Sequence, residues 1–467
     1  MKMSLKKGGT ARIPLVPLLG RGYFIFIIHL YKGEQNTMAL LTQAPKGTQD
    51  LYPPQSSKWQ VVEDVMRSEA TIHGFGEVRT PVFEHTELFL RSVGDTTDVV
   101  EKQMYTFTDK GGRSITLRPE GTAGAVRAML EHALYNEGLP VKLYYLPSCY
   151  RYEKPQAGRL REFHQFGVEM FGAEAPVADA EVICLAKSIF DRLGVKNLTL
   201  ELNSIGCPTC RAKFHEALKK YFEGYKDELC ETCLSRLERN PMRILDCKSP
   251  VCSKIAEGAP HILDYLCDDC KAHFEGVQAY LKAAGVEFVI NPTIVRGLDY
   301  YNRTVFEFVS NDLGAQSTVC GGGRYDGLTE QMGGKSMAGL GFGLGMERLM
   351  LVLEAQKITI PEPPTCEIYI ASMGEKASQE AFRLTNLLQS SGVVAACDVC
   401  GRGLKAQMKY ANKIGAAFTL VLGDNELEEK QGKLKNMKTG EEKPISLGDQ
   451  FLEDYLVITT MASDLSM

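Results

Sequence analysis

The sequence lacks an excess of positive charge, internal repeats, low-complexity tracts and any apolar run long enough to cross a bilayer. The net charge of −5 excludes a uniformly basic protein, although a local basic patch remains compatible with nucleic-acid binding. The missing apolar run predicts a protein without a membrane partner. With 44% hydrophobic and 24% charged residues, the 467-residue chain has a globular composition, and its length predicts two or three domains.

Fourteen cysteines occur in the chain, and most of them form Cys-x2-Cys pairs. In a large chain this pattern predicts metal thiolates in a reducing, cytoplasmic setting, with free thiols, disulfides and an iron–sulfur cluster as alternatives. Zinc binds four thiolates tetrahedrally, and the Cys-x2-Cys spacing aims two sulfurs at one ion. Chain order predicts one structural zinc site and a second set: Cys207, Cys210, Cys230 and Cys233, then Cys247, Cys252, Cys267 and Cys270. We interpret the separate pair Cys397 and Cys400 as incidental.

Residues 141–169 read as an antiparallel hairpin, with strands at 141–150 and 162–169 joined by a turn around Pro155 and Gly158. Residues two apart in a strand share a face. One face of the second strand therefore carries Phe163, Gln165, Gly167 and Glu169, and the other carries Glu162, His164, Phe166 and Val168. Guanidinium groups of Arg151, Arg159 and Arg161 suit phosphate or carboxylate oxygens. The alternative is a solvated hairpin with ordinary cross-strand ion pairs.

This hairpin resembles motif 2 of the class II aminoacyl-tRNA synthetases, and residues 151–165 resemble its histidyl-tRNA synthetase form. Residues 75–84 resemble the dimer-forming motif 1, and residues 339–349 resemble motif 3. Residues 296–301 and 320–326 resemble the two histidine-specific motifs. The chain is thus similar to the histidyl-tRNA synthetase family over roughly residues 44–460, and ordered agreement is more specific than any single match.

The resemblance implies an α+β fold in which the class II catalytic domain is an antiparallel sheet flanked by helices. We expect this domain at residues 38–205 and 286–360, interrupted by an inserted helical, cysteine-rich module at residues 206–285. A linker at 361–365 precedes an anticodon-binding domain at 366–467, where strands alternate with helices as in an α/β sheet. Residues 1–37 show no periodic link to the rest of the chain, and we expect a non-native or disordered leader there.

The resemblance further implies ATP-dependent attachment of L-histidine to tRNA(His) by a cytoplasmic homodimer. Arg151 and Arg296 are the candidate catalytic residues, placed on either side of the α-phosphate. The candidate histidine-binding residues are Glu120, Thr122, Arg151, Gln165, Glu169, Arg296, Tyr300, Tyr301 and Tyr325. The candidate ATP-binding residues are Arg151, Glu153, Arg159, Arg161, Phe163 and Arg348, with Mg²⁺ on the phosphates. Gly341, Gly343 and Gly345 suit close approach of the backbone to the nucleotide.

For tRNA, we expect Lys154 and Gln156 to contact the acceptor end, and Arg402, Lys405 and Lys409 to face the anticodon stem from a helix at 404–414. The alternatives are a surface ion pair between Arg151 and Glu153, and a merely solvated face for the second set. At the level of function, one alternative is the inactive regulatory subunit of ATP phosphoribosyltransferase, which tends to lack the 296–301 stretch and the anticodon-binding domain. The other is a zinc-dependent nucleic-acid-binding protein.

Overall fold

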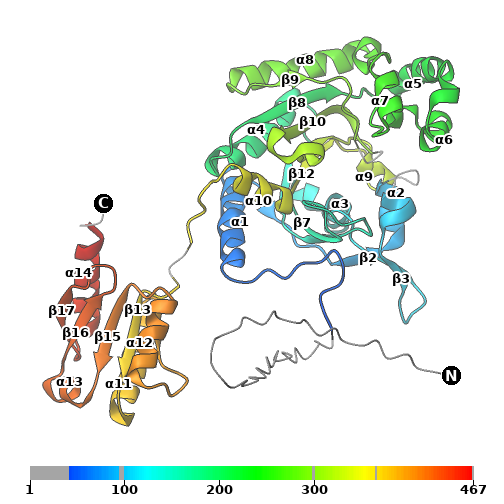
Figure 1. Cartoon of the computed structure of the whole chain (residues 1–467). Coiled ribbons are helices and arrows are strands. Elements are labelled where there is room, and N and C mark those ends of the chain that lie inside the picture. The colour runs from blue at the N-terminus through cyan, green and yellow to red at the C-terminus, as the bar shows by residue number, and fades with distance from the viewer. Residues whose placement is uncertain (1–41, 94–98, 297–299, 363–364, 465–467) are drawn as a thin grey trace, which may run out of the picture. The chain divides into compact units, whose positions relative to one another are not determined.

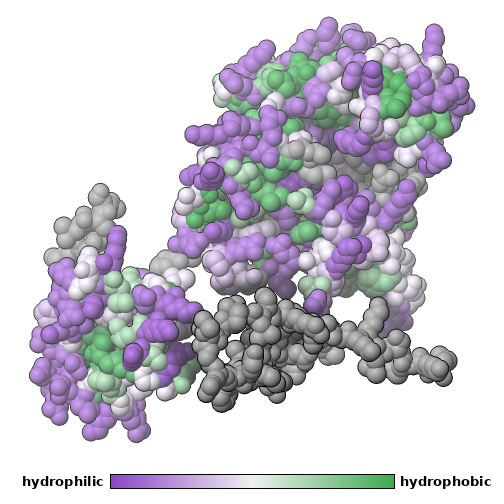
Figure 2. All heavy atoms as spheres, viewed as in Figure 1, coloured by the Kyte–Doolittle hydropathy of each residue, from purple (hydrophilic) through white to green (hydrophobic). Residues whose placement is uncertain are grey.

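The computed structural model describes residues 42–93, 99–296, 300–362 and 365–464 (Figure 1). The expected leader, residues 1–37, lies outside the described residues, and so do residues 297–299. None of the helices in the described ranges has both the length and the apolar character needed to span a membrane. On the face shown in Figure 2, hydrophilic residues predominate and hydrophobic ones occur in small groups. The apolar faces of the elements are therefore turned mostly inward.

A largely antiparallel sheet forms the centre of residues 42–362, with strand order β1-β5-β7-β12-β11-β10-β8-β9 and β6 beside β7. Only the outer pairs β1–β5 and β8–β9 are parallel in this sheet as described. Its strands are β1 (Gly76–Glu77), β5 (Val141–Tyr145), β6 (Ser148–Tyr150), β7 (Glu162–Phe171), β8 (Leu198–Ser204), β9 (Val289–Ile290), β10 (Asn302–Ser310), β11 (Thr318–Arg324) and β12 (Gly339–Gly345). With its flanking helices, this sheet confirms the predicted α+β class.

One face of β7 enters the hydrophobic core, where Phe166 and Val168 are fully buried against β12 and the helices. The predicted alternation of faces along this strand is confirmed, because Gln165 and Glu169 lie on the other side. The helices of this part are α1 (Gln55–Ile72), α2 (Thr86–Val93), α3 (Thr122–Glu131), α4 (Pro176–Arg192), α9 (Leu328–Gln331) and α10 (Met346–Ala355). Helix α4 packs against α1, and α10 packs against β7.

Two predicted strands are broken by proline. The expected strand at 141–150 divides into β5 and β6 at Pro147, which has no N–H to donate to a ladder. The expected strand near residues 75–83 divides around Pro81 into β1 and β2 (Phe83–His85). Strand β2 joins a separate three-stranded sheet with β4 (Ser114–Leu117) and β3 (Thr106–Thr108). The break lets one chain segment serve two sheets.

The module at residues 206–285 is helical, as predicted. Its helices are α5 (Pro208–Glu223), α6 (Glu231–Arg239), α7 (Pro250–Ala256) and α8 (Asp268–Ala283), with short 3-10 turns between them. Phe214, Leu218 and Phe222 repeat every fourth residue of α5 and are fully buried in a cluster with Leu237 and Ile244. Helix α8 packs against α4 of the sheet part.

The C-terminal part contains a five-stranded sheet of order β14-β13-β15-β16-β17. Its parallel core of β13 (Ile368–Ser372), β14 (Ala395–Cys397) and β15 (Phe418–Leu422) was predicted, as were α11 (Glu375–Ser390) and α12 (Leu404–Lys413). An antiparallel hairpin of β16 (Gln431–Asn436) and β17 (Glu442–Ser446), with α13 (Asp424–Glu429) and α14 (Phe451–Asp464), was not predicted. The hairpin is rich in charge and buries few of its side chains.

Candidate active site

Three glycines form one row across the central sheet. Tyr145, Gly167, Gly343, Gly321 and Glu307 are successive partners on β5, β7, β12, β11 and β10. A Cβ on Gly343 would lie 2.1 Å from Nε2 of Gln165, and one on Gly321 would lie 2.5 Å from a guanidinium nitrogen of Arg296. One on Gly167 would lie 2.4 Å from the ring of Tyr145. The row therefore makes room for three polar side chains on one side of the sheet.

Gly341 has a similar purpose beside this row. Its Cβ would lie 2.1 Å from Oε2 of Glu169. The sequence predicted that Gly341, Gly343 and Gly345 let a nucleotide approach the backbone. In the structure Gly341 and Gly343 accommodate Glu169 and Gln165, whereas a Cβ on Gly345 would meet none of the described residues within 4 Å.

Glu169 lies fully buried between two phenols. The hydroxyl of Tyr145 donates to its Oε1 at 2.6 Å, and the hydroxyl of Tyr325 donates to its Oε2. Burial raises the pKa of Glu169 to about 8, against the opposing effect of these hydrogen bonds. Glu169 is therefore an ionisable group whose pKa lies close to neutral pH and whose side chain is packed among tyrosines. Sequence reasoning missed Tyr145, whose ring the two glycines Gly121 and Gly167 accommodate.

Glu120 and Thr122 stand at the N-terminus of α3. The Glu120 carboxylate accepts hydrogen bonds from the N–H groups of Thr122, at 2.6 Å, and Ala123, at 2.9 Å. Burial raises the pKa of Glu120, and these two N–H groups oppose the shift. The Thr122 hydroxyl lies 3.3 Å from that of Tyr145, which links this helix end to Glu169.

Three arginines lie near one another at the hairpin. Arg151 is held by a hydrogen bond from its Nε to the Pro119 carbonyl at 2.8 Å, and its guanidinium lies 5.2 Å from the centre of the Phe163 ring. Burial lowers the pKa of Arg348, and the charges of Arg159 and Arg151 lower it further. Like charges brought this close favour an anion between them.

Glu153 pairs with Arg159 and not with Arg151, so the surface ion pair considered from the sequence is not formed. Arg161 lies over the ring of Tyr152, 4.0 Å from its centre, and donates from Nε to the Glu153 carbonyl. Lys154 and Gln156 are exposed on the turn of the hairpin. Arg348 donates to the carbonyls of Thr318 at 2.7 Å and Gly158 at 3.2 Å, which ties motif 3 to this turn.

Arg296 is half-buried and forms an ion pair with Glu307, while its guanidinium lies 5.3 Å from the centre of the Tyr301 ring. Burial works to lower the pKa of Arg296, but Tyr301 and Glu307 outweigh it and raise that pKa. Its buried Nε meets no hydrogen-bond acceptor within the described ranges. A fixed positive charge with a spare donor is suited to an anionic ligand.

Tyr300, Tyr301 and Tyr325 form a buried aromatic cluster. The ring centres of Tyr300 and Tyr301 lie 4.6 Å apart, and those of Tyr300 and Tyr325 lie 5.5 Å apart. The cluster joins Arg296 to Glu169, because Tyr301 contacts the first and Tyr325 the second. The structure thus brings most of the predicted histidine-site residues to one side of the sheet.

In the C-terminal part, Lys405 and Lys409 are exposed on α12. Arg402, which was also expected to face outward, is only partly exposed. Its guanidinium pairs with Asp398 at 3.2 Å and lies over the Tyr410 ring, 4.3 Å from its centre. Gln407 was missed: it is buried and exchanges hydrogen bonds of 2.9 Å with the backbone of Ser372, which fixes α12 on β13.

The eight cysteines of the module form two groups of four, but not in chain order. One group is Cys207, Cys210, Cys267 and Cys270, and the other is Cys230, Cys233, Cys247 and Cys252. The predicted sets were therefore wrong in membership. The start of α5 meets the start of α8, so Cys207 and Cys210 join Cys267 and Cys270 and not the next pair in sequence, Cys230 and Cys233.

Two family profiles match the chain. The profile described as histidyl-tRNA synthetase matches residues 47–210 and 253–349, and the profile described as anticodon binding domain matches residues 367–453. The first profile omits residues 211–252, which contain all four cysteines of the second group.

Individual proteins agree with these profiles. The chain is 55% identical over 410 residues to the histidine–tRNA ligase of Caldanaerobacter subterraneus subsp. tengcongensis, covering 88% of this chain and 98% of that one. It is 52% identical over 409 residues to the histidine–tRNA ligase of Clostridioides difficile, covering 87% and 97%. The crystal structure of apo S. aureus histidyl-tRNA synthetase matches with a TM-score of 0.76 and 41% identity, covering 89% of this chain and 100% of that one.

Proposed function

The chain belongs to the histidyl-tRNA synthetase family, and from that membership we propose how its residues divide the work of the reaction. The protein is a histidine–tRNA ligase: it joins L-histidine to tRNA(His) at the expense of ATP. In the first step a carboxylate oxygen of histidine attacks the α-phosphorus, and the bond to the β-phosphate breaks to release diphosphate. In the second step a ribose hydroxyl of the tRNA attacks the acyl carbon, and AMP leaves.

The observation that best supports the assignment of roles is the glycine row of the sheet. It places Arg296 over Gly321 and Gln165 over Gly343, on the same side as Glu169 and the tyrosine cluster. A substrate on this side meets a cation at one end and a carboxyl group at the other. Catalysis of this kind depends mainly on positioning and on stabilising negative charge as it concentrates.

Arg151 and Arg296 are the catalytic residues in this account. Arg151 bridges the histidine carboxylate and the α-phosphate, and Arg296 reaches the α-phosphate from the other side. Both guanidiniums are held before any ligand arrives, Arg151 by the Pro119 carbonyl and Arg296 by Glu307. A preorganised cation needs little rearrangement when the charge develops.

Histidine is recognised by hydrogen bonds to its amino group and ring. Glu120, Thr122, Gln165 and Glu169 surround the amino group, and Tyr301, Tyr325 and Glu169 contact the imidazole, with Tyr300 packed behind them. Tyr145 is added to this set because its hydroxyl holds Glu169 at 2.6 Å. A pocket of buried polar partners rejects analogues that leave those partners unpaired.

ATP binds with Mg²⁺ as the substrate complex, against the arginines of the hairpin. Phe163 stacks below adenine through its ring, and Arg348 lies above it as a cation–π partner. Glu153 and Arg159 meet the adenine edge and the γ-phosphate, and Arg161 assists them. The proximity of Arg348 to Arg151 and Arg159 supports a phosphate between these charges.

The contacts with tRNA(His) are also divided between the catalytic part and the C-terminal part of the chain. Lys154 and Gln156 meet the acceptor end of tRNA(His), and the exposed Lys405 and Lys409 meet the anticodon stem, with Arg402 ordered by Asp398. We also infer a cytoplasmic homodimer that pairs through the motif 1 segment. The eight module cysteines take no part in the chemistry, because four protein ligands fill a tetrahedral metal site and leave no position for a substrate.

Charging of tRNA tests this function directly. With ATP, labelled histidine and tRNA(His), the protein should produce histidyl-tRNA, and omission of ATP should abolish the product. A regulatory subunit would bind histidine without charging tRNA. Histidine binding with no transfer of label would therefore overturn the proposed roles.

A further inference from the structure

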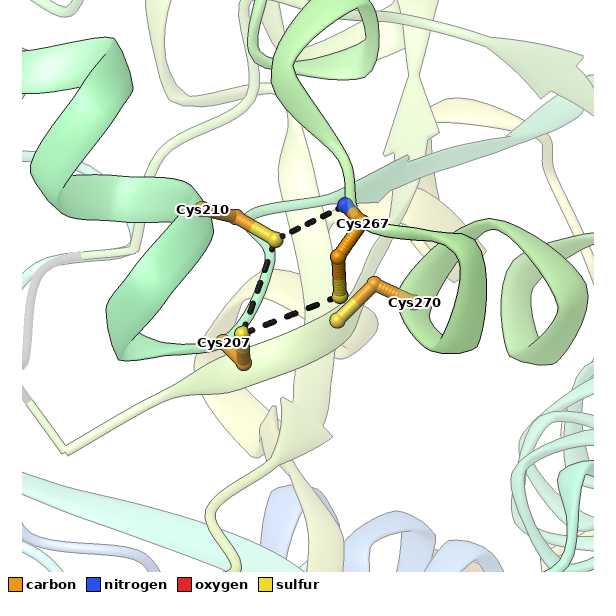
Figure 3. A group of neighbouring side chains, drawn as sticks. All are labelled: Cys207, Cys210, Cys267 and Cys270. Carbon is orange, nitrogen blue, oxygen red and sulfur yellow. Dashed lines mark hydrogen bonds between the residues drawn. The ribbon is translucent and has the colours of Figure 1, made fainter.

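The first cysteine group joins the two ends of the inserted module. Cys207 and Cys210 lie at the start of α5, and Cys267 and Cys270 lie at the start of α8 (Figure 3). The Sγ atoms of Cys207 and Cys210 are 3.5 Å apart, and those of Cys207 and Cys267 are 4.0 Å apart. All four sulfurs lie within 4.8 Å of one another. Figure 3 shows the four side chains converging on one small space.

The second group repeats this arrangement inside the module. Cys230 and Cys233 lie at the start of α6, Cys252 lies in the first turn of α7, and Cys247 lies in the segment between these helices. The Sγ atoms of Cys230 and Cys247 are 3.9 Å apart, and all four sulfurs again lie within 4.8 Å. In both groups two cysteines are buried and two are half-buried.

These distances match a single tetrahedral ion. With zinc–sulfur bonds of about 2.3 Å, the sulfurs at the corners of a tetrahedron stand roughly 3.8 Å apart. A disulfide would bring two sulfurs to about 2.05 Å, and all eight cysteines are free thiols. In an iron–sulfur cluster the four thiolates are divided among two or four irons, so four sulfurs packed this closely leave too little space. The geometry therefore favours one ion in each group.

The backbone supports thiolate character in both groups. The N–H of Cys267 donates to Sγ of Cys210 at 3.1 Å, and the N–H of Cys230 donates to Sγ of Cys252 at 3.3 Å. The N–H of Ser249 donates to Sγ of Cys247 at 3.4 Å. Helix N-termini also direct positive partial charge at the sulfurs. Such outer hydrogen bonds orient metal ligands and tune their charge.

The module also has a physical need for cross-links. Between Cys207 and Cys270 its short helices are joined by turns, and their buried apolar residues, such as Phe214, Leu218 and Leu237, form one cluster with residues of the sheet part. A segment of this size seldom gains more than a few kcal/mol from its core alone. A bound metal supplies folding free energy to small domains of this kind.

We propose that the inserted module contains two structural zinc sites, one formed by Cys207, Cys210, Cys267 and Cys270 and the other by Cys230, Cys233, Cys247 and Cys252. The first site closes the module where it leaves and rejoins the catalytic sheet. The second site holds α6 and α7 together at its far side. Each site has four thiolates and no open position, so neither takes part in catalysis.

Metal analysis of the full-length protein, purified without chelator, should find two zinc ions per chain. The Cys207→Ser/Cys267→Ser variant should retain one ion, and the Cys230→Ser/Cys247→Ser variant should also retain one. The matched control is Cys397→Ser/Cys400→Ser, which also removes two cysteines, from a Cys-x2-Cys pair outside the module, and should retain two ions. Zinc-free wild-type protein with residues 206–285 resistant to protease would overturn the proposal, and so would iron at these sites.

Cobalt replacement tests which cysteines share an ion. In the cobalt-loaded Cys207→Ser/Cys267→Ser variant, the remaining ion should keep the absorption of a four-thiolate tetrahedral site. If the ions were held by chain-order sets, this variant would leave three thiolates at each site, and both spectra would change. X-ray absorption can be measured on the wild-type zinc protein, so it does not depend on the folding of any variant. The spectrum should show four sulfurs at about 2.3 Å from zinc. Nitrogen or oxygen ligands in that spectrum would contradict the assignment.

Discussion

The guanidinium of Arg243 donates a hydrogen bond of 2.8 Å to the main-chain carbonyl of Arg296. Arg243 lies in the short helix Pro241–Ile244, between Cys233 and Cys247 of the second cysteine group. The carbonyl of Arg243 in turn accepts a hydrogen bond of 3.0 Å from Arg236 of α6. The inserted module therefore contacts the backbone of a candidate catalytic residue, and the order of the module bears on the position of Arg296.

Replacing Arg243 should slow catalysis without weakening ATP binding. A hydrogen bond from a charged group is worth about 1.5–3 kcal/mol, so Arg243→Ala should lower kcat for adenylate formation roughly tenfold or more. Arg243→Lys, which keeps a donor, should recover part of the loss. Arg239→Ala, an exposed arginine of the neighbouring helix α6, serves as the control. Equal kcat for Arg243→Ala and this control would show that the contact does not position Arg296.

Arg348→Ala should raise the KM for ATP more than it lowers kcat. The guanidinium lies close to Arg151 and Arg159 and would stack on adenine, so its loss removes binding that ground state and transition state share. Arg348→Lys should give an intermediate KM, because it keeps the charge and loses the planar stacking surface. Steady-state pyrophosphate exchange at varied ATP measures both constants. An unchanged KM for ATP would remove Arg348 from the adenine site.

The pH dependence of histidine use should report Glu169. Its pKa of about 8 means that the free enzyme holds this group neutral below pH 8, beside Tyr145, Tyr325, Thr122 and Glu120. As pH rises through 8 the carboxylate forms, and it attracts the cationic amino group of histidine. We therefore expect kcat/KM for histidine to rise between pH 7 and 9 with an apparent pKa near 8. Glu169→Gln should show a low kcat/KM that follows only the titration of the substrate. The same pH profile in both proteins would contradict this role.

The buried ion pair between Arg324 and Asp179 should contribute strongly to the free energy of unfolding. Arg324 is fully buried and donates to Asp179 at 2.6 Å and 3.0 Å, and His273 of α8 lies 3.1 Å from the same carboxylate. Removal of Asp179 leaves the buried Arg324 with the partly exposed Asp326, at 3.1 Å, as its remaining ion-pair partner among the described residues. Asp179→Ala should therefore cost about 3–5 kcal/mol. Asp191→Ala breaks an exposed pair with Lys187 on the same helix and should cost at most about 1 kcal/mol. Denaturant titration compares the two variants, and equal losses would refute the prediction.

The ion pair between Asp179 and Arg324 should also make the stability of the fold fall at acid pH. Burial works to raise the pKa of Asp179, but hydrogen bonds from His273 and Arg324 outweigh it and hold the pKa below its usual value of 3.8. A carboxyl group with a depressed folded pKa stabilises the fold above its unfolded pKa, and that stabilisation is lost as pH falls below it. The acid limb of the stability curve should therefore be shallower in the Asp179→Asn variant than in the wild type.

Periodicity and motif order predicted the parts of the fold that depend on local sequence. The faces of β7 were predicted because a strand alternates with period two whatever packs against it. Tyr145 could not be assigned, because its role arises from the register that sets it opposite Gly167. Asp179, Arg324 and His273 belong to three elements far apart in sequence, and the packing of α4 against both α8 and β11 brings them together.

The cysteine groups also show that local spacing does not predict which distant residues meet in the fold. Spacing identified the eight residues, because two sulfurs on one helix start are a local property. Chain order then paired neighbouring helices, whereas the fold brings α5 to α8 and encloses α6 and α7 between them.

The hairpin of β16 and β17 was missed for a different reason. In β16 only Gly432 and Leu434 are buried, so its apolar signal is weak.

Histidine-dependent exchange of pyrophosphate into ATP, in the wild type and in Arg296→Ala, tests the central claim most directly. The wild type should exchange label only when histidine is present. The variant should lose roughly 10² to 10³ in rate, while calorimetry shows ATP and histidine still bound, because a charge aimed at the α-phosphate acts chiefly in the transition state. Near-normal exchange by Arg296→Ala, or no exchange by the wild type, would contradict the account.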